Sequence, residues 1–243
     1  MVPNGVFASP DSGYQRLERA HPRDILAWAA LGIDRLAVAT SFQSSGLVIL
    51  HMLRELRPDV PVLFLETGFH FQETLAFKDQ IAELWDLKLV ELRGAHGSPE
   101  HQAEQYGSEL YKRDPHQCCF INKVAPLQEA LEEYDGWISG LRRDQSPLRV
   151  ETPIVEAQML PSGNEVLKLH PLASWSREEV SGYIDEHAIP THPLLERGFA
   201  SIGCRPCTRA VSDFEDDRAG RWDGLAKTEC GIHSFGTSSE AEQ

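Results

Sequence analysis

The 243-residue sequence lacks the features that mark several classes of protein. No run approaches the ~18 uninterrupted apolar residues of a membrane-spanning helix, so no association with a membrane is expected. The opening residues, MVPNGVFASPDSG, show no basic segment followed by an apolar run, which argues against a secretory signal. Positive charge is also scarce, with 23 Lys and Arg against 37 Asp and Glu. The formal net charge of −14 argues against a general nucleic-acid binder.

The composition predicts a soluble globular protein with one main domain. Hydrophobic residues make up 41% of the chain and charged residues 25%, which are ordinary values and exclude wholesale disorder. No internal repeat, low-complexity tract or linker is visible. We therefore expect one α/β domain over residues 1–225, followed by a C-terminal segment over residues 226–243. The tail FGTSSEAEQ has nothing to bury and is expected to be mobile.

The basic residues are unevenly distributed. Two stretches, 112–149 and 197–227, hold twelve of the 23 Lys and Arg residues, although they are distant in the sequence. Chance clustering is one explanation. The other is an anion site in an acidic protein, built where the two stretches meet.

Four of the five cysteines form two pairs, the adjacent Cys118 and Cys119 and the CxxC pair Cys204 and Cys207. With no export signal and a chain long enough to bury a core, a reducing compartment, the cytoplasm, is expected. Clustered cysteines there more often bind metal or perform redox chemistry. Adjacent cysteines fit poorly on one tetrahedral ion, which favours a 4Fe–4S cluster over zinc. The remaining alternative is that buried cysteines act as small hydrophobes.

The fifth cysteine, Cys230, stands in the segment KTECGIH between Lys227 and His233. Nearby positive charge raises the thiolate fraction of a cysteine. On a flexible segment, such a thiol could react with a bound substrate and then move out to meet a reductant. Beside a four-cysteine cluster and an anion site, Cys230 is therefore a candidate nucleophile.

Apolar, β-prone runs alternate with helix-like stretches along the first part of the chain. The predicted strands are Arg35–Thr40, Pro61–Thr67, Leu87–Leu92 and Gly136–Gly140. The predicted helices between them are Leu47–Leu56 and Phe71–Trp85. This alternation predicts βαβ units and a mostly parallel sheet with helices on both faces.

The two ends of this pattern carry further signals. The residues before the first strand look helical, with a predicted buried face of Leu17, Ile25, Leu26 and Trp28. After Arg149, TPIVEA and EVLKLHPL flank the turn PSGN and predict a β-hairpin. Ser176 and Glu179 form a capping-box pattern at the start of a predicted helix, Arg177–Glu186. From Pro190 onward little regular structure is expected.

Two loops at strand ends are candidate anion sites. SFQSSG follows the first strand, where backbone N–H groups and a helix dipole favour an anion, although it is not a Walker loop. An ordinary strand–helix turn capped by Ser44 or Ser45 is the alternative. RRDQSP, Arg142–Pro147, follows the fourth strand, at the carboxyl end where open α/β sheets bind ligands. Its two guanidinium groups suit sulfate or phosphate, and a solvated loop is the alternative.

An ordered set of motifs resembles one family, the thioredoxin-dependent adenylyl-sulfate (APS) and phosphoadenylyl-sulfate (PAPS) reductases. The motifs are LETGFHFQET, CCxxxK, GLRRDQSP, SIGCRPCT, GRW and KTECGIH, spread over about Leu36 to His233. The cysteine pair plus CxxC resembles the iron–sulfur branch, which typically prefers APS. The sequence departs from the family in SFQSSG, where relatives have glycine-rich loops, and in Glu66, where they have Asp.

The resemblance implies a fold, a site and a reaction. The fold is adenine-nucleotide α-hydrolase-like and related to PP-loop enzymes. Cys118, Cys119, Cys204 and Cys207 would hold a 4Fe–4S cluster, and Cys230 would be catalytic. The implied substrate-binding residues are Ser41, Ser44, Ser45, Leu65, Thr67, Gly68, Lys123, Gly140, Arg142, Arg143, Arg218 and Arg221.

The implied reaction reduces APS to sulfite and AMP through an S-sulfocysteine on Cys230, with thioredoxin or a glutaredoxin-like protein as reductant. Family members commonly form homodimers or larger assemblies. Three alternatives stay open: a PAPS reductase, a PP-loop ATP-dependent sulfur-transfer or tRNA-thiolation enzyme, and a non-catalytic iron–sulfur or zinc protein. The last leaves KTECGIH without a purpose.

Overall fold

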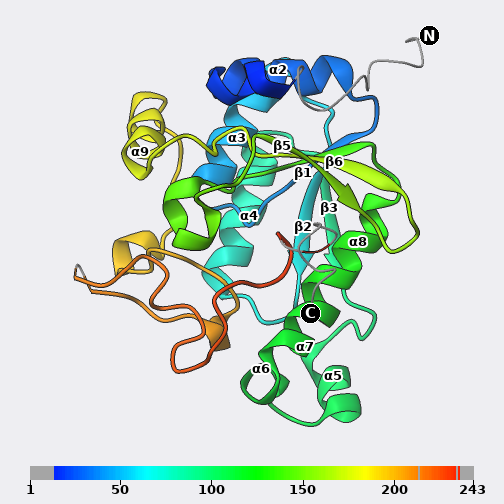
Figure 1. Ribbon diagram of the computed structural model, residues 1–243. Helices are drawn as coiled ribbons and strands as arrows, with labels where there is room; N and C mark the ends of the chain where they lie inside the picture. The colour runs from blue at the N-terminus through cyan, green and yellow to red at the C-terminus, as the bar shows by residue number, and fades with distance from the viewer. Residues whose placement is uncertain (1–13, 213, 234, 236–243) are drawn as a thin grey trace.

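The computed structural model describes residues 14–212, 214–233 and 235. Its centre is a six-stranded sheet in the order β3-β2-β1-β4-β6-β5 (Figure 1). The strands are β1 Leu36–Ala39, β2 Val62–Glu66, β3 Leu89–Arg93, β4 Gly136–Ser139, β5 Val155–Met159 and β6 Glu165–Leu169. All neighbouring strands are parallel except β5 and β6, which form the predicted antiparallel hairpin. The predicted α/β fold and its four leading strands are confirmed.

Helices cover both faces of the sheet, as the βαβ pattern predicts. Val38 and Val62 pack into one hydrophobic cluster together with residues of α2 (Pro22–Gly32), α3 (Ser44–Leu56) and α9 (Arg177–Glu186). Alternate residues of the same strands, Ala37 and Leu63, pack into a second cluster. The period of two along a strand thus divides the core between two layers. The helix α4, Gln72–Leu84, matches the second predicted helix within a residue at each end.

The second cluster joins the sheet to α8, Ala125–Leu131, and to the far C-terminal end of the described chain. Phe235 is buried there with Val124 and Leu127, and Ile232 packs against the same cluster. In Figure 1 the red C-terminal part of the chain accordingly runs back to the middle of the molecule. The boundary expected at residue 225 stays a prediction. Residues 236–243 of the expected mobile tail lie outside the described residues.

The chain between β3 and β4 holds several short helices that were not predicted from sequence patterns. These are α5 Pro99–Tyr106, α6 Leu110–Arg113, α7 Pro115–Cys119, the π-helical turn η2 Phe120–Val124, and α8. The turn η2 widens the helix directly after the cysteine pair. Such π-helical turns often mark functional sites because the extra residue changes the direction of the side chains that follow.

Outside the sheet, most predicted elements are confirmed, with one correction. Ser176 and Glu179 form the predicted capping box of α9. Leu17 and Ile25 are buried as expected, but Trp28 on α2 is 36% exposed, because it lies at the rim against Tyr14 rather than under the helix. Beyond Pro190 the described chain has only two 3₁₀ turns, η5 Leu195–Arg197 and η6 Arg205–Cys207. No helix in the described part of the chain is long and apolar enough to cross a membrane.

A buried histidine fastens the irregular C-terminal part of the chain to α4. His192 is fully buried, with Nε2 3.0 Å from Thr74 Oγ1, and its Nδ1 accepts the Leu194 N–H. Both ring nitrogens therefore have partners when the ring is neutral. Burial lowers the pKa of His192 to about 4.

This histidine should make stability fall in mild acid. Between pH ~6.5 and ~4 the unfolded chain binds a proton that buried His192 does not, so the free energy of unfolding falls as pH falls. Between pH 7 and pH 5, the free energy of unfolding of His192→Gln should fall by about 2 kcal/mol less than that of the wild type. Urea unfolding at both pH values measures this difference. Identical pH dependence in the two proteins would show that His192 is not the titrating group.

Candidate active site

A large cavity opens at the carboxyl ends of β1, β2 and β4, the edge at which parallel α/β sheets bind ligands. Its volume is about 990 Å³. The lining includes the following predicted site residues: Ser41, Ser44, Ser45, Leu65, Lys123, Gly140, Arg142, Arg218, Arg221 and Cys230. Segments far apart in the sequence thus meet at one site, and both basic stretches contribute to it.

The loop after β1 forms one wall of this cavity. Helix α3 begins at Ser44 with Gln43 as its N-cap, and the expected capping by a serine side chain is absent. The Gln43 side chain instead holds the backbone of Ile202, accepting its N–H at 2.8 Å and donating to its carbonyl at 2.8 Å. It also donates to Ser41 Oγ at 2.7 Å. Gln43 therefore connects the SFQSSG loop, a candidate anion site, to the segment that leads into the CxxC motif.

Two glycines allow this loop to pack tightly. A Cβ atom on Gly46 would lie 2.0 Å from Thr40 Oγ1, and one on Gly140 would lie 3.2 Å from the Gly46 nitrogen. Any side chain at Gly46 would therefore displace the loop. The first turn of α3 and the end of β4 are consequently in direct contact, with the N–H groups of α3 facing the cavity edge.

The two arginines of RRDQSP have different surroundings. Arg142 is buried in the cavity wall, donates to Ser45 Oγ at 2.7 Å and pairs with Asp144 at 2.9 Å. Arg143 lies outside the lining and instead pairs with Glu18 at 2.7 Å. The structure thus places Arg143 outside the cavity, at the start of the short turn η3, Arg143–Gln145, with its side chain directed toward the N-terminal part of the chain.

The LETGFHF loop after β2 has mainly internal contacts. Leu65 reaches the cavity, whereas Thr67 and Gly68 are not part of its lining. The Glu66 carboxylate accepts the Gly68 N–H at 2.7 Å. This glutamate, at which the sequence departs from the family motif, therefore helps to shape the loop. Gly68 has a φ of +73°, and a Cβ there would lie 2.6 Å from Pro99. Thr67 Oγ1 lies 3.5 Å from Cys204 Sγ, so this loop contacts the cysteine site as well as the large cavity, which Leu65 and His70 line.

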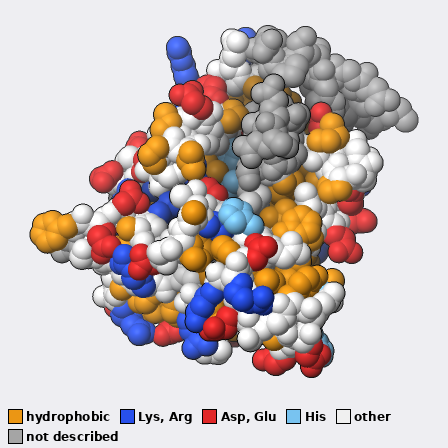
Figure 2. All heavy atoms as spheres, turned by 60° about the horizontal axis from the view of Figure 1, so that its bottom comes forward, with side chains coloured by type: hydrophobic (Ala, Val, Ile, Leu, Met, Phe, Trp, Pro, Cys, Tyr) orange, Lys and Arg blue, Asp and Glu red, His pale blue; other side chains and the backbone are white. Residues whose placement is uncertain are grey.

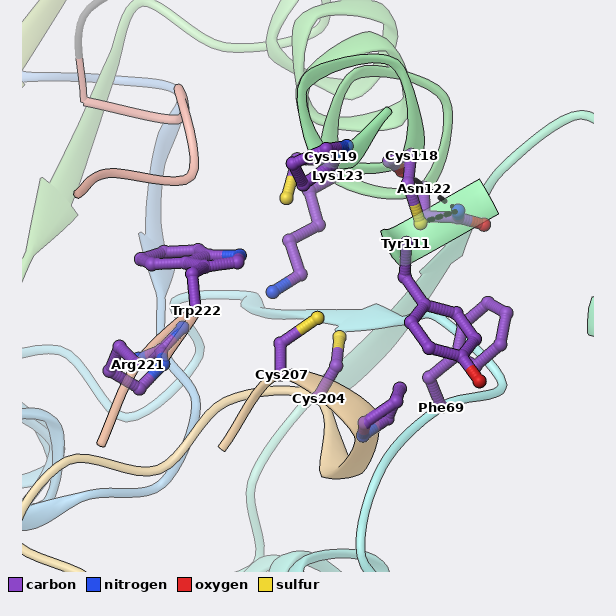
Figure 3. A pocket seen from close by; sticks show the side chains of 12 residues that line it. Phe69, Tyr111, Cys118, Cys119, Asn122, Lys123, Cys204, Cys207, Arg221 and Trp222 are labelled. Carbon is purple, nitrogen blue, oxygen red and sulfur yellow. Dashed lines mark hydrogen bonds between the residues drawn. The ribbon is translucent and has the colours of Figure 1, made fainter. Parts of the chain in front are cut away.

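The four paired cysteines line a second, small cavity that adjoins the first (Figure 3). Cys118 and Cys119 come from α7, and Cys204 and Cys207 come from the two ends of η6. The ammonium of Lys123 points toward the thiols of the CxxC pair (Figure 3). Within the described ranges, no three Cys, His, Asp or Glu side chains are arranged to hold a single metal ion.

The electrostatics of this second cavity depend on burial. Burial raises the pKa of Cys119 to about 11 and that of Cys207 to about 12, and it also raises the pKa of Cys118. Burial by itself lowers the pKa of Lys123, but the negative charge of Cys204, Cys230 and Cys119 raises it overall. The thiols thus require positive charge in order to ionise, and Lys123 supplies one such charge on the side of the larger cavity.

Arg221 lines both cavities. Its guanidinium carbon lies 4.5 Å from the centre of the Trp222 ring, and Nη1 donates to Ser201 Oγ at 3.2 Å. Its Nε is buried and has no hydrogen-bond partner among the described residues. A Cβ on Gly203 would lie 2.3 Å from Nη2, so glycine is needed for this close approach. A buried donor without a partner is the expected state of a residue that binds an anion.

The segment carrying Cys230 lies against the cavity. Cys230 and His233 are both in the lining. Lys227 is buried and reaches His116 on α7 at 3.2 Å, directly before the cysteine pair. Sequence reasoning missed two partners of this segment, Arg149 and Lys168. Arg149 was visible as a member of the first basic stretch, but nothing in the sequence pairs it with Glu229.

On the surface, positive and negative side chains are interspersed over the coloured part of the face in Figure 2. Both signs of charge are thus present on this face, although the formal net charge of the sequence is −14. Lys123, Arg142, Arg218 and Arg221 line the large cavity.

Fold and cavity together define an α/β nucleotide-binding protein with a thiol site at the carboxyl edge of its sheet. Residues 35–210 match the phosphoadenosine phosphosulfate reductase domain, so the chain belongs to this family. The predicted family is confirmed.

The relatives support the same assignment over nearly the whole chain. It is 41% identical over 220 residues to adenosine 5′-phosphosulfate reductase of Halalkalibacterium halodurans, covering 90% of this chain and 94% of the relative. It is 43% identical over 220 residues to adenosine 5′-phosphosulfate reductase of Streptomyces coelicolor, covering 90% and 91%. A phosphoadenosine 5′-phosphosulfate reductase of Gloeobacter violaceus is 43% identical over 216 residues, with 88% of each chain covered.

Solved structures agree on the fold. PAPS reductase from Candida auris, crystallised as a phosphate complex, superimposes with a TM-score of 0.70 at 29% identity, covering 82% of this chain and 94% of that one. FMN adenylyltransferase from Candida glabrata reaches a TM-score of 0.55 at 14% identity, covering 84% and 69%. The second similarity concerns the fold alone.

Arg221→Ala should weaken binding of an anionic nucleotide. Loss of one charge-assisted contact costs about 1.5–3 kcal/mol, so the Kd for AMP should rise roughly ten- to a hundredfold. Calorimetric titration measures this Kd. Arg197→Ala is the matched control, because Arg197 is 61% exposed and pairs with Glu73 on the surface. An unchanged Kd for Arg221→Ala, with its melting temperature intact, would remove Arg221 from the anion site.

Proposed function

We propose that this protein is an APS reductase, which reduces adenylyl sulfate to sulfite and AMP with a dithiol protein of the thioredoxin or glutaredoxin type. One observation carries the proposal: the thiol of Cys230 lines the same cavity as Lys123, Arg218 and Arg221. A nucleophile and three cations thus face one volume at the nucleotide edge of the sheet. Relatives named adenosine 5′-phosphosulfate reductase at 41% and 43% identity support the choice of substrate.

The first chemical step is attack by the Cys230 thiolate on the sulfur of APS. The S–O bond to the phosphate breaks, AMP leaves, and an S-sulfocysteine forms on Cys230. Because thiolate and substrate are both anionic, their approach needs positive charge. Lys123, Arg218 and Arg221 supply this charge in a cavity where water is partly excluded.

The second step is attack by a thiolate of the reductant on the Cys230 sulfur. Sulfite leaves with the electron pair of the S–S bond, and a mixed disulfide forms. The second thiol of the reductant then attacks this disulfide, which frees Cys230 and leaves an oxidised dithiol. The two electrons thus come from the reductant, and the site residues need only bind, orient and stabilise charge.

We further propose that Cys118, Cys119, Cys204 and Cys207 hold a 4Fe–4S cluster. A cubane takes one thiolate at each of four separate iron atoms, so its ligands need not converge on one ion. Bound there, the cluster would supply the positive iron charge that ionises buried thiols, and it would join α7 to η6. Lys123 lies between these thiols and the cavity, so its positive charge would act on both the thiolates and the substrate.

A PAPS reductase is the second candidate function. The Gloeobacter violaceus relative with that name is as similar as the APS reductases, at 43% identity. A 3′-phosphate on the substrate would require further positive charge at the far end of the cavity. Sulfite release from APS and PAPS, measured side by side, decides between the two.

Anaerobically purified protein should contain about four iron and four sulfide per chain, as thiolate ligation of a cubane requires. Cys204→Ser should lose most of this iron, whereas Cys230→Ser should retain it as a matched cysteine control. Iron and sulfide analysis with a visible absorption spectrum provides the measurement. Stoichiometric zinc without iron would overturn the cluster assignment.

Cys230→Ser should bind APS but release no sulfite, because a hydroxyl is a far weaker nucleophile at neutral pH. Wild-type protein mixed with APS alone should gain ~80 Da, one sulfuryl group, on the peptide containing Cys230. Reduced thioredoxin should remove this mass. Peptide mass spectrometry and a sulfite assay measure both effects. Sulfite release by Cys230→Ser at a near-normal rate would exclude Cys230 from the reaction.

A further inference from the structure

The segment on either side of Cys230 is held to the rest of the protein at several points. Before the cysteine, Glu229 forms two hydrogen bonds with Arg149, at 2.9 Å from Nε and 2.6 Å from Nη2. After it, Lys168 donates to the His233 carbonyl at 2.9 Å. Gln158 donates to the Phe235 carbonyl at 2.6 Å, and the Phe235 side chain is buried.

These contacts differ in their dependence on the side chains of the segment. Lys168 and Gln158 bind backbone carbonyl groups, which every sequence provides. Glu229 binds through its own carboxylate, and this carboxylate is the immediate neighbour of the nucleophile in the chain. The side chain of Arg149 is only 8% exposed and that of Glu229 only 22%, so the pair is largely removed from water.

Glu229 also balances the charge of a second arginine. Arg218 Nη2 lies 3.1 Å from Glu229 Oε2 and donates to the Thr228 carbonyl at 2.8 Å. Without the carboxylate, Arg149 and Arg218 would face one another as like charges in a poorly solvated place. Loss of one partner of a buried ion pair is strongly unfavourable because the other charge stays buried and unpaired.

We propose that Glu229 is a positioning residue that docks the nucleophile-bearing segment, with Arg149 and Arg218 as its receptor. In the docked state Cys230 faces the cavity. In the undocked state its sulfur is open to solvent and to a protein reductant. The role of Cys230 as nucleophile rests on the proposed function, but the docking itself does not.

Arg218 connects this docking to the substrate. It lines the cavity and at the same time holds the carbonyl of Thr228 and the carboxylate of Glu229. An anion in the cavity therefore meets an arginine that is already oriented by the docked segment. Substrate binding and docking of the nucleophile should consequently support one another, as linkage requires.

The rate of Cys230 alkylation by iodoacetamide tests the docking directly, because it requires no turnover. In holoprotein, Glu229→Gln should raise this rate roughly tenfold, since the amide keeps the size but loses the charge. Arg149→Gln should raise it by less, because Arg218 still pairs with Glu229, and Glu229→Asp should restore part of the protection. The double variant of Glu229→Gln and Arg149→Gln should react no faster than Glu229→Gln alone, because Glu229→Gln already removes the interaction with Arg149. Peptide mass spectrometry separates Cys230 from the other four cysteines.

Sulfite assays and melting temperatures complete the test. Glu229→Gln should lower kcat several-fold while the melting temperature stays within a degree or two of the wild type. Glu55→Gln is the matched control, because Glu55 also pairs with an arginine, Arg23 at 2.6 Å, on the exposed faces of α3 and α2. This control should change neither alkylation nor kcat.

The proposal is overturned if Glu229→Gln and wild type are alkylated at the same rate, whatever happens to sulfite release. It is also overturned if faster alkylation comes with a large fall in melting temperature, which would indicate general loosening. If the wild-type protein makes no sulfite, but Glu229→Gln still speeds the alkylation of Cys230, the proposed function is refuted and the docking proposal stands.

Discussion

Buried positive charge is the constraint on which the rest of the site depends. Lys123 is partly buried beside thiols, and Arg149 is buried beside a carboxylate. A buried cation is tolerated only where an anion or several acceptors compensate it. In both places the compensating groups come from a distant part of the chain: the CxxC motif for Lys123 and Glu229 for Arg149. The fold can therefore complete its cavity only by bringing the C-terminal part of the chain back across the sheet edge.

Further side-chain contacts hold the irregular region after residue 190, which has no strands or long helices among the described residues. Gln43 binds the backbone of Ile202, His192 binds Thr74, and Lys227 binds His116. Each contact joins a residue of the α/β domain to a segment whose own backbone hydrogen bonds form turns. Side-chain contacts thus replace regular secondary structure, and each places one element of the site: the nucleotide loop, the CxxC turn or the Cys230 segment.

The sequence predicted the sheet and the cysteine groups because both depend on local patterns. Alternation of residues such as Ala37 and Val38 identifies strands, and the spacing of Cys204 and Cys207 identifies a thiol pair. The pairing of Arg149 with Glu229 spans 80 residues and follows from no local pattern. The same limit explains Arg143, which belongs to the matching motif but is turned toward Glu18. The helices between β3 and β4 were missed because they are short and interrupted by a π-helical turn.

That π-helical turn has a chemical consequence. Lys123 follows Cys119 by four residues, a spacing that in a regular α-helix places two side chains on the same face. A π-helical turn changes this direction, so the two side chains need not be stacked. In the structure Cys119 lines the small cavity, while Lys123 extends across to the CxxC thiols and also lines the large cavity. One helical segment thereby supplies ligand candidates to one cavity and a cation to both.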